Sequence, residues 1–207
     1  LRLGIIPTVA PYFLPRLIRH LAERYPDLDL RPREAVTPKL VRDLTEGRLD
    51  LALVALPVSE PSLAEHPLFD EDFLLVRPQA MQGHPVPTVD ALRQMPLLLL
   101  EEGHCFRDQA ISFCKLPPAL SGEIMEGSSL STLVQMVVIG SGATAVTLIP
   151  AMAARIETLS AAVALDRLPD PRPGRTLGLV WRRSNPLADR FGLMAAQLAN
   201  DLQETGD

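Results

Sequence analysis

The stretch TPKLVRDLTEGRLDLALVAL, residues 37–56, contains the unit on which the predicted fold is built: a helix, a glycine turn and an apolar strand. Thr37 is of the residue type preferred at helix N-caps, and Pro38 suits the first helical position. Gly47 is expected to end the helix, and an apolar strand follows at 50–56. Helical spacing predicts that the inward face of this helix is formed by Leu40, Val41 and Leu44.

The residues before this stretch alternate between strand and helix in the same way. A short apolar strand at 1–6 precedes a helix that begins near Pro11 and stops at Pro26. A second strand is expected between Leu28 and Val36. The resulting β-α-β-α-β order predicts a parallel sheet with helices on its faces.

Two threonines directly follow strands of this predicted sheet, and ligands bind beyond the carboxyl ends of such strands. Thr8 follows the first strand and Thr37 follows the second. Each residue also has a structural explanation, because Thr8 suits a turn and Thr37 suits a helix cap. From spacing alone, the structural role is the better interpretation of both threonines.

The rest of the chain predicts a second α/β unit and a return to the first. Strands are expected at 73–76, 123–125, 145–149 and 176–181, and helices at 89–94, 105–114, 128–140, 150–158 and from 186 onward. A buried-looking apolar run lies at 96–100. Linkers near 70–73 and 166–175 would let the last strand and helix rejoin the first unit. The chain is therefore predicted to hold two α/β units.

The stretch GHCFRDQAISFC, residues 103–114, holds both cysteines of the chain and one of its four histidines. A helix over 105–114 is predicted by the helical spacing of Phe106, Ala110 and Phe113. Nine helical positions separate the Cα atoms of Cys105 and Cys114 by about 13.5 Å, whereas a disulfide needs about 7 Å or less. The two cysteines can pair only if this helix unwinds, so their oxidation would change the conformation.

The two cysteines differ in their expected reactivity. Cys105 begins the predicted helix, where backbone N–H groups and the helix dipole favour a thiolate, and His104 and Arg107 flank it. Such a thiolate attacks peroxides, disulfides and electrophiles. Cys114 lies among apolar residues, where a role as a small core residue explains it equally well. A metal site is disfavoured because the paired Cys/His spacing of zinc sites is missing.

Composition favours a folded domain that does not bind nucleic acid itself. The 207 residues are 47% hydrophobic, and no apolar run is long enough to cross a membrane. The formal net charge is −5 without a Lys/Arg run, which makes DNA phosphates poor partners. Two cysteines do not form the disulfide framework of a small secreted domain, so a reducing, cytoplasmic setting is favoured. The chain begins on a strand without a signal peptide, which favours an excised domain or a processed chain.

Motifs along nearly the whole chain resemble the effector-binding domains of LysR-type transcriptional regulators. They lie at 3–8 with Pro15, 47–50, 67–71, 140–142 and 175–180. Within that family, residues 103–114 resemble the OxyR branch, the hydrogen-peroxide sensors, although Phe106 stands where this branch often has a smaller aliphatic residue. The resemblance implies an α/β fold of two Rossmann-like subdomains, similar to type 2 periplasmic binding proteins and joined by two crossover strands.

The same resemblance implies a domain organisation. Regulatory subdomain I would comprise 1–72 and 173–207, and regulatory subdomain II, which carries the redox cysteines, would comprise 73–172. A winged helix-turn-helix DNA-binding domain would lie upstream of this chain.

The resemblance also implies roles for seven residues, matched by position. Cys105 matches the peroxide-reactive cysteine and Cys114 the resolving cysteine, which implies a Cys105–Cys114 disulfide formed through a sulfenic acid. The residues that match those around the peroxide are Thr8, Thr37, His104, Asp108 and Arg175. This match outweighs the structural explanation of the two threonines.

The implied partners are hydrogen peroxide, further copies of the chain in a homodimer or homotetramer, promoter DNA through the upstream domain, RNA polymerase, and glutaredoxin or thioredoxin as reductant. No cofactor, metal or membrane is implied. Two other interpretations stay open. A LysR-type effector domain that binds a small organic anion would keep its response after Cys105→Ser. A thiol peroxidase, disfavoured because its thioredoxin-like pattern is absent, would consume peroxide continuously with a reductant.

Overall fold

The computed structural model describes residues 1–115, 125–140 and 145–204, and the chain divides into two compact units. The first unit comprises Leu1–Glu71 and Arg175–Asp207, and the second comprises Asp72–Gly174. The chain passes from one unit to the other within two long strands, β4 (Leu63–Pro78) and β9 (Gly174–Arg182). The predicted α/β class with two crossover strands is confirmed.

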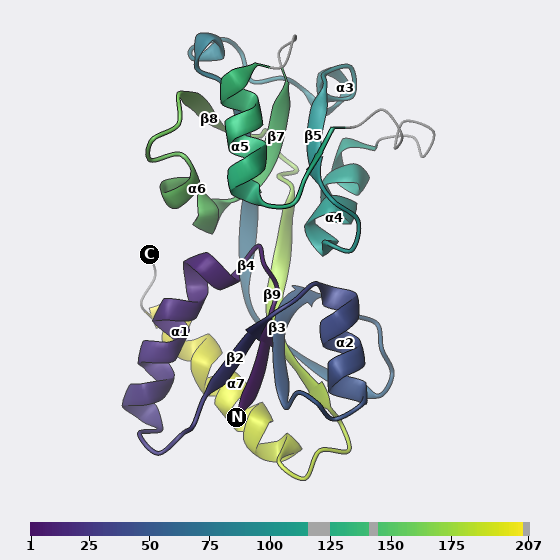
Figure 1. Cartoon of the computed structure of the whole chain (residues 1–207), viewed down its shortest axis with the longest axis vertical. Coiled ribbons are helices and arrows are strands. Elements are labelled where there is room, and N and C mark those ends of the chain that lie inside the picture. Colours follow the sequence, from purple (N-terminus) through teal and green to yellow (C-terminus); the bar gives the residue numbers. More distant parts are fainter. Residues whose placement is uncertain (116–124, 141–144, 205–207) are drawn as a thin grey trace. The chain divides into compact units, whose positions relative to one another are not determined.

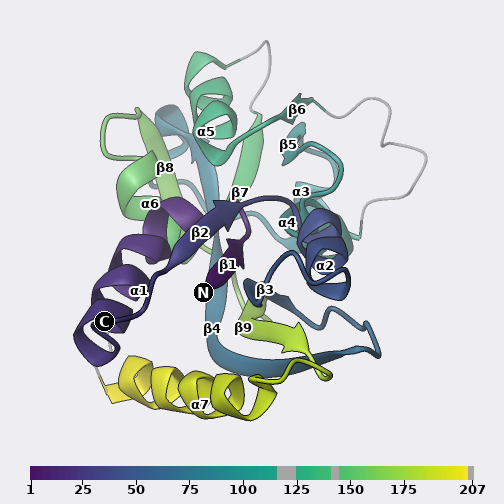
Figure 2. The ribbon, with the colours of Figure 1, turned by 60° about the horizontal axis from the view of Figure 1, so that its bottom comes forward.

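The first unit follows the predicted order of β1 (Arg2–Ile5), α1 (Ala10–Arg24), β2 (Arg31–Glu34), α2 (Thr37–Thr45) and β3 (Leu51–Leu56). Strand β1 pairs parallel with both β2 and β3, and β9 pairs antiparallel with β3. The last helix, α7 (Ala188–Glu204), lies beside α1 on one side of these strands, and α2 lies on the other (Figures 1 and 2). Every residue of β3 except Leu56 is buried, which makes this strand the centre of the unit's apolar core.

The second unit is built on strands in the order β8-β4-β7-β5-β6. Strand β4 is antiparallel to β7 (Val146–Pro150) and β8 (Val163–Arg167), whereas β5 (Leu97–Leu100) is parallel to β6 (Glu126–Gly127) and β7. Its helices are α3 (Val89–Leu92), α4 (Cys105–Cys114), α5 (Leu130–Ile139) and α6 (Ala151–Glu157), with a short 3-10 helix at Gln79–Met81. Helices α4 and α5 both contact β5, whose four leucines are all buried (Figure 1).

The second strand differs from its prediction. It consists of Arg31–Glu34, whose side chains are all exposed, rather than of the apolar residues on either side. Among the described residues, strand β2 lies at the edge of the sheet and pairs with β1 alone, so its side chains do not have to be apolar. An edge strand also tolerates Pro32, and its charged side chains discourage pairing with other chains.

Other boundaries also differ from their predictions. Strand β4 is longer than 73–76 and runs through the predicted linker at 70–73, because pairing with distant strands holds its polar segment extended. Helix α5 is capped by Ser129 rather than Ser128, since the Ser129 hydroxyl accepts from the backbone N–H of Thr132 at 3.2 Å. Strand β6 follows the predicted 123–125, of which 123 and 124 lie outside the described residues.

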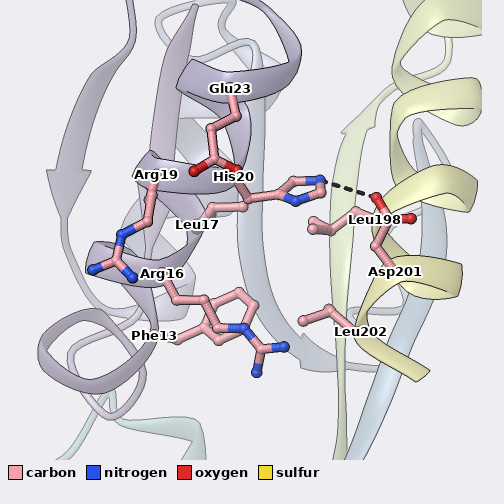
Figure 3. A pocket seen from close by; sticks show the side chains of 9 residues that line it. All are labelled: Phe13, Arg16, Leu17, Arg19, His20, Glu23, Leu198, Asp201 and Leu202. Atoms are coloured by element: carbon pink, nitrogen blue, oxygen red, sulfur yellow. Dashed lines mark ion pairs between the residues drawn. The ribbon is translucent and has the colours of Figure 1, made fainter. Parts of the chain in front are cut away.

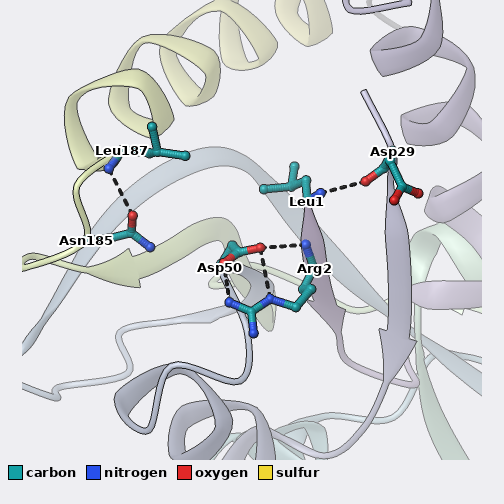
Figure 4. Close-up of polar contacts among 6 residues, drawn as sticks. All are labelled: Leu1, Arg2, Asp29, Asp50, Asn185 and Leu187. Carbon is teal, nitrogen blue, oxygen red and sulfur yellow. Dashed lines mark hydrogen bonds and ion pairs between the residues drawn. The ribbon is translucent and has the colours of Figure 1, made fainter. Parts of the chain in front are cut away.

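Polar contacts hold the beginning of β1 and of α7 (Figure 4). The Arg2 guanidinium donates to the Asp50 carboxylate with Nη2–Oδ1 2.6 Å, and the Arg2 backbone N–H donates to Asp50 Oδ2 at 2.7 Å. These bonds hold the pKa of Asp50 below its usual value and tie β1 to the start of β3. At α7, Asn185 Oδ1 accepts from the backbone N–H of Leu187 at 2.9 Å.

Candidate functional site

Helix α4 begins and ends at the two cysteines, as the spacing predicted. Gly103, with a φ of 92°, turns the chain after β5, and His104 is the N-cap. At the other end, Lys115 takes the left-handed conformation with a φ of 49° and ends the helix. Both cysteines are free thiols, and the rise of the helix separates their Cα atoms by about 13.5 Å. The structure is therefore that of the dithiol form.

Cys105 lies in the first turn of α4 and is half-buried, so part of its surface is open to small solutes. His104 beside it is half-buried, and Asp108, three positions on, is exposed. The backbone N–H groups of a first helical turn have no partners within the helix and favour a negative charge nearby. These features suit a reactive thiolate.

Gln109 is a candidate that the motif reasoning missed. It lies four residues after Cys105 and therefore on the same face of α4. Its amide oxygen Oε1 is buried and has no hydrogen-bond partner among the described residues. A buried acceptor of this kind is normally satisfied, so a ligand O–H is a suitable partner for it. The signal that would have found it is the four-residue spacing from Cys105.

The position of Arg107 in the motif had suggested that its charge lies beside Cys105. The structure places its side chain elsewhere. Its side chain is buried, and its Nη1 donates to the Leu100 carbonyl at 2.8 Å and pairs with Glu126 Oε1 at 2.6 Å. Two helical positions correspond to about 200° of rotation, which directs Arg107 away from the Cys105 face. Arg107 therefore ties the first half of α4 to β5 and β6, and its charge is paired with a carboxylate.

Cys114 has no exposed surface, and burial raises the pKa of its thiol to about 11, with Arg93 acting in the opposite direction. The Nε–H of Arg93 donates to the Cys114 carbonyl at 3.0 Å. Because the thiolate is the nucleophilic form, a buried neutral thiol does not react until it is exposed.

In the first unit, the structure brings together two of the predicted residues, Thr8 and Arg175. Arg175 Nη1 donates to Thr8 Oγ1 at 2.8 Å, and Nη2 donates to the Thr8 carbonyl at 3.1 Å. On the other side, Glu71 Oε2 accepts from Arg175 Nε at 2.9 Å. All three residues are buried, and Glu71 is the partner that sequence reasoning missed.

Thr37 is not the N-cap that the sequence predicted. It is the first residue of α2, the N-cap is Val36, and no side chain caps this helix. The Thr37 hydroxyl oxygen is buried without a hydrogen-bond partner among the described residues. The Thr37 hydroxyl thus lies after β2 and is available to a ligand. In the predicted N-cap role, it would instead have accepted a hydrogen bond from a backbone N–H of the helix.

The first unit also has a separate cavity between α1 and α7, of about 330 Å³ (Figure 3). His20 of α1 points across it to Asp201 of α7, with Nε2–Oδ2 3.2 Å. None of the seven predicted site residues lines it. Over residues 1–115, 125–140 and 145–204, the structure contains no cluster of three His, Cys, Asp or Glu side chains suited to a metal ion, and no helix that could cross a membrane.

Comparison with known proteins identifies the family. Residues 1–203 match the family model of the LysR substrate binding domain. The chain belongs to this family. Two curated relatives of this LysR domain are a probable hydrogen peroxide-inducible genes activator of Streptomyces viridosporus, 44% identical over 99% of the chain, and the DNA-binding transcriptional dual regulator OxyR of Escherichia coli K12, 40% identical over 94%. The chain spans 66% and 64% of the lengths of these two relatives.

Solved structures similar to this LysR domain include OxyR regulatory domains. The reduced form from Pseudomonas aeruginosa has a TM-score of 0.80 and 32% identity, covering 96% of each chain. A sulfate-bound mutant OxyR2 regulatory domain from Vibrio vulnificus has a TM-score of 0.84 and 33% identity, covering 97% of this chain and 94% of that one. A cysteine-to-serine mutant of Corynebacterium glutamicum OxyR, bound to H2O2, has a TM-score of 0.87 and 36% identity, covering 99% and 65%. The predicted family and fold are confirmed.

Proposed function

We propose that this chain is the hydrogen-peroxide-sensing regulatory domain of an OxyR-like LysR-type transcription factor. The observation that supports it most is the difference between two free thiols at opposite ends of α4: Cys105 is half-buried in the first turn, and Cys114 is fully buried at the end. One thiol is open to peroxide, and the other is protected until the helix opens. The relatives named as peroxide-inducible activators point to the same function.

The chemistry uses one peroxide for each disulfide. The Cys105 thiolate attacks one peroxide oxygen, the O–O bond breaks, and the leaving hydroxide takes up a proton to become water. Cys105 becomes a sulfenic acid. The Cys114 sulfur then attacks the Cys105 sulfur, the S–O bond breaks, and the Cys114 proton leaves with the hydroxyl group as a second water. The domain is thus a stoichiometric sensor rather than a turnover enzyme.

In this proposal, the remaining predicted residues bind the peroxide and assist the leaving hydroxide. Thr8 and Thr37 hold peroxide oxygens through their hydroxyls. Arg175 already donates to Thr8 Oγ1, which leaves the hydroxyl proton of Thr8 for a ligand. His104, Asp108 and Arg175 supply a proton or positive charge to the departing oxygen.

The output of the sensor follows from the unwinding of α4, which pairing of its cysteines requires. A refolded segment changes the surface of the second unit and thereby the assembly of a homodimer or homotetramer. In the longer protein, an upstream winged helix-turn-helix would bind promoter DNA and communicate with RNA polymerase. Glutaredoxin or thioredoxin in the cytoplasm would reduce the disulfide and reset the sensor.

The test is intact mass and thiol counting on the reduced chain before and after one equivalent of hydrogen peroxide. We expect the parent to lose both thiols and about 2 Da, the mass of two hydrogen atoms. Cys105→Ser should stay unmodified, and Cys114→Ser should gain about 16 Da as a sulfenic acid without forming the internal disulfide.

Two unreactive thiols in the parent would contradict the proposal and favour an effector domain for a small organic ligand. Continued peroxide consumption in the presence of a dithiol reductant would instead favour a thiol peroxidase.

A further inference from the structure

The two ends of α4 are held by different arginines, one deep in the second unit and one at its surface. At the Cys105 end, Arg107 has a side chain 6% exposed and bonds to Leu100 of β5 and Glu126 of β6. At the Cys114 end, Arg93 has a side chain 32% exposed and donates to the Cys114 carbonyl at 3.0 Å. The arginine contact at the Cys114 end is therefore the more exposed of the two.

The bond from Arg93 acts on a helix end that needs partners. The last carbonyls of a helix have no N–H partner within it, and a guanidinium placed there is favoured by both hydrogen bonding and the helix dipole. Arg93 follows α3 directly, and α3 contacts α4. The Arg93–Cys114 bond thus joins the end of α4 to a neighbouring helix 21 residues earlier in the chain.

Disulfide formation has to break this arrangement. The Cα atoms of Cys105 and Cys114 must approach from about 13.5 Å to about 7 Å or less. Because Arg107 ties the Cys105 end to two strands, Cys114 is the residue that moves. Its thiol must leave the core, and its carbonyl must leave Arg93.

We propose that Arg93 is a positioning residue for the resolving cysteine: it holds Cys114 in the dithiol helix and thereby limits how fast, and how completely, the Cys105 sulfenic acid closes to the disulfide. This inference rests on the proposed peroxide-sensing function and deepens it. The step it controls needs no additional oxidant, because the S–S bond forms as the S–O bond of the sulfenic acid breaks and water leaves. Peroxide attack on Cys105 itself precedes this step and does not involve Arg93.

The experiment separates the two chemical steps in the 207-residue chain, which matches the extent of regulatory domains solved as separate chains. Sulfenic acid formation is timed in the Cys114→Ala background, and disulfide closure is timed in chains with both cysteines by quenched mass spectrometry. The dithiol–disulfide equilibrium is measured against glutathione. The variants are R93M, which keeps the aliphatic stem but removes the donors, and R93K, which keeps a charge and a donor.

We expect R93M to leave sulfenic acid formation unchanged and to accelerate disulfide closure roughly three- to tenfold, the effect of losing one hydrogen bond of ordinary strength at a part-buried site. The equilibrium with glutathione should shift toward the disulfide by a similar factor, since the bond stabilises only the dithiol form. R93K should fall between R93M and the parent.

Two controls distinguish this bond from general loosening of α3. D90N removes the exposed carboxylate that pairs with Arg93 Nη1 at 3.3 Å but keeps the bond to Cys114, so it should behave as the parent does. T88A removes the α3 cap, in which Thr88 Oγ1 accepts from the Ala91 N–H, and leaves Arg93 in place.

The inference would be overturned if disulfide closure were as fast in T88A as in R93M. It would also be overturned if R93M kept the closure rate and the equilibrium of the parent. Either result would leave the proposed function intact. A parent that forms no Cys105–Cys114 disulfide would overturn both.

Discussion

Cys105 and Cys114 carry the same thiol group in different surroundings. The burial of Cys114 makes the stability of the folded chain depend on pH. Burial raises the pKa of Cys114 to about 11. In the unfolded chain a cysteine loses its proton near pH 8.5. Above that pH the unfolded state binds fewer protons than the folded state, so stability falls as pH rises. The contribution of the buried Cys114 thiol to the free energy of unfolding is complete below about pH 8.5. It is lost as the pH rises toward the pKa of Cys114 in the folded state.

We predict that the free energy of unfolding of the parent declines relative to that of Cys114→Ala by on the order of 1–2 kcal/mol as pH rises from about 8.5 toward the folded pKa. The measurement is urea unfolding of both proteins with a reductant present at a series of pH values. Taking the difference between the two proteins removes the titration of tyrosines and lysines, which they share. Parallel curves over this range would show that Cys114 is not protected by burial.

Helix α4 is held to the second unit by an aromatic contact in addition to Arg107. Phe106 is 2% exposed, and its ring lies 4.7 Å from that of Phe73 in β4, centroid to centroid, in an edge-to-face arrangement. Phe113, whose helical spacing from Phe106 and Ala110 helped to predict α4, is only half-buried, whereas Cys114 is buried. The apolar residues on the buried face of α4 are Phe106, Ala110 and Cys114, which follow one another at intervals of four.

Phe106→Leu should therefore lower the free energy of unfolding by about 1–2 kcal/mol, through the lost ring contact and incomplete filling of the site. Phe113→Leu on the same helix is the matched control and should change it by less than about 0.5 kcal/mol. Urea unfolding of the reduced chains measures both values. Equal losses in the two variants would mean that the Phe73 contact contributes nothing beyond ordinary burial.

At the scale of the whole molecule, the two crossover strands are joined by a buried ion pair. Glu71 of β4 and Arg175 of β9 have side chains 4% and 0% exposed, and their atoms Oε2 and Nη2 lie 2.8 Å apart. Arg175 also holds Thr8 after β1, so three distant segments of the first unit meet at one guanidinium. Removing one member of such a pair leaves a buried charge without compensation.

Glu71→Gln should destabilise the chain by about 3–5 kcal/mol. Asp70→Asn is the matched control on the same strand, because Asp70 Oδ1 accepts an exposed hydrogen bond of 2.6 Å from the Thr176 hydroxyl. We expect that substitution to cost no more than about 1 kcal/mol. The denaturant concentration at the midpoint of unfolding is measured for both variants. Similar midpoints would show that the Glu71–Arg175 pair stabilises the chain no more than the exposed Asp70 bond does.

Local patterns predicted much of the secondary structure and the placement of the two cysteines at the ends of α4. These patterns predicted the span of α4, the apolar strand β3 and the left-handed Gly140 that ends α5, because each depends on residues within a few positions of one another. The cysteine spacing alone indicated that oxidation requires a conformational change. In contrast, the residues that form β2 could not be predicted from an apolar pattern, because all four are exposed and pair with β1.

The sequence by itself determined the family, the alternation of strands and helices, and the placement of the two thiols at opposite ends of one helix. Only the tertiary structure decided that Arg107 pairs with Glu126, that Arg93 holds the Cys114 carbonyl, and that Glu71 and Arg175 meet. The physical reason is the separation along the sequence of the residues that interact. A helix or a turn is stabilised by bonds across three or four residues, whereas the partner of Arg175 lies 104 positions away and is brought to it by the pairing and packing of strands.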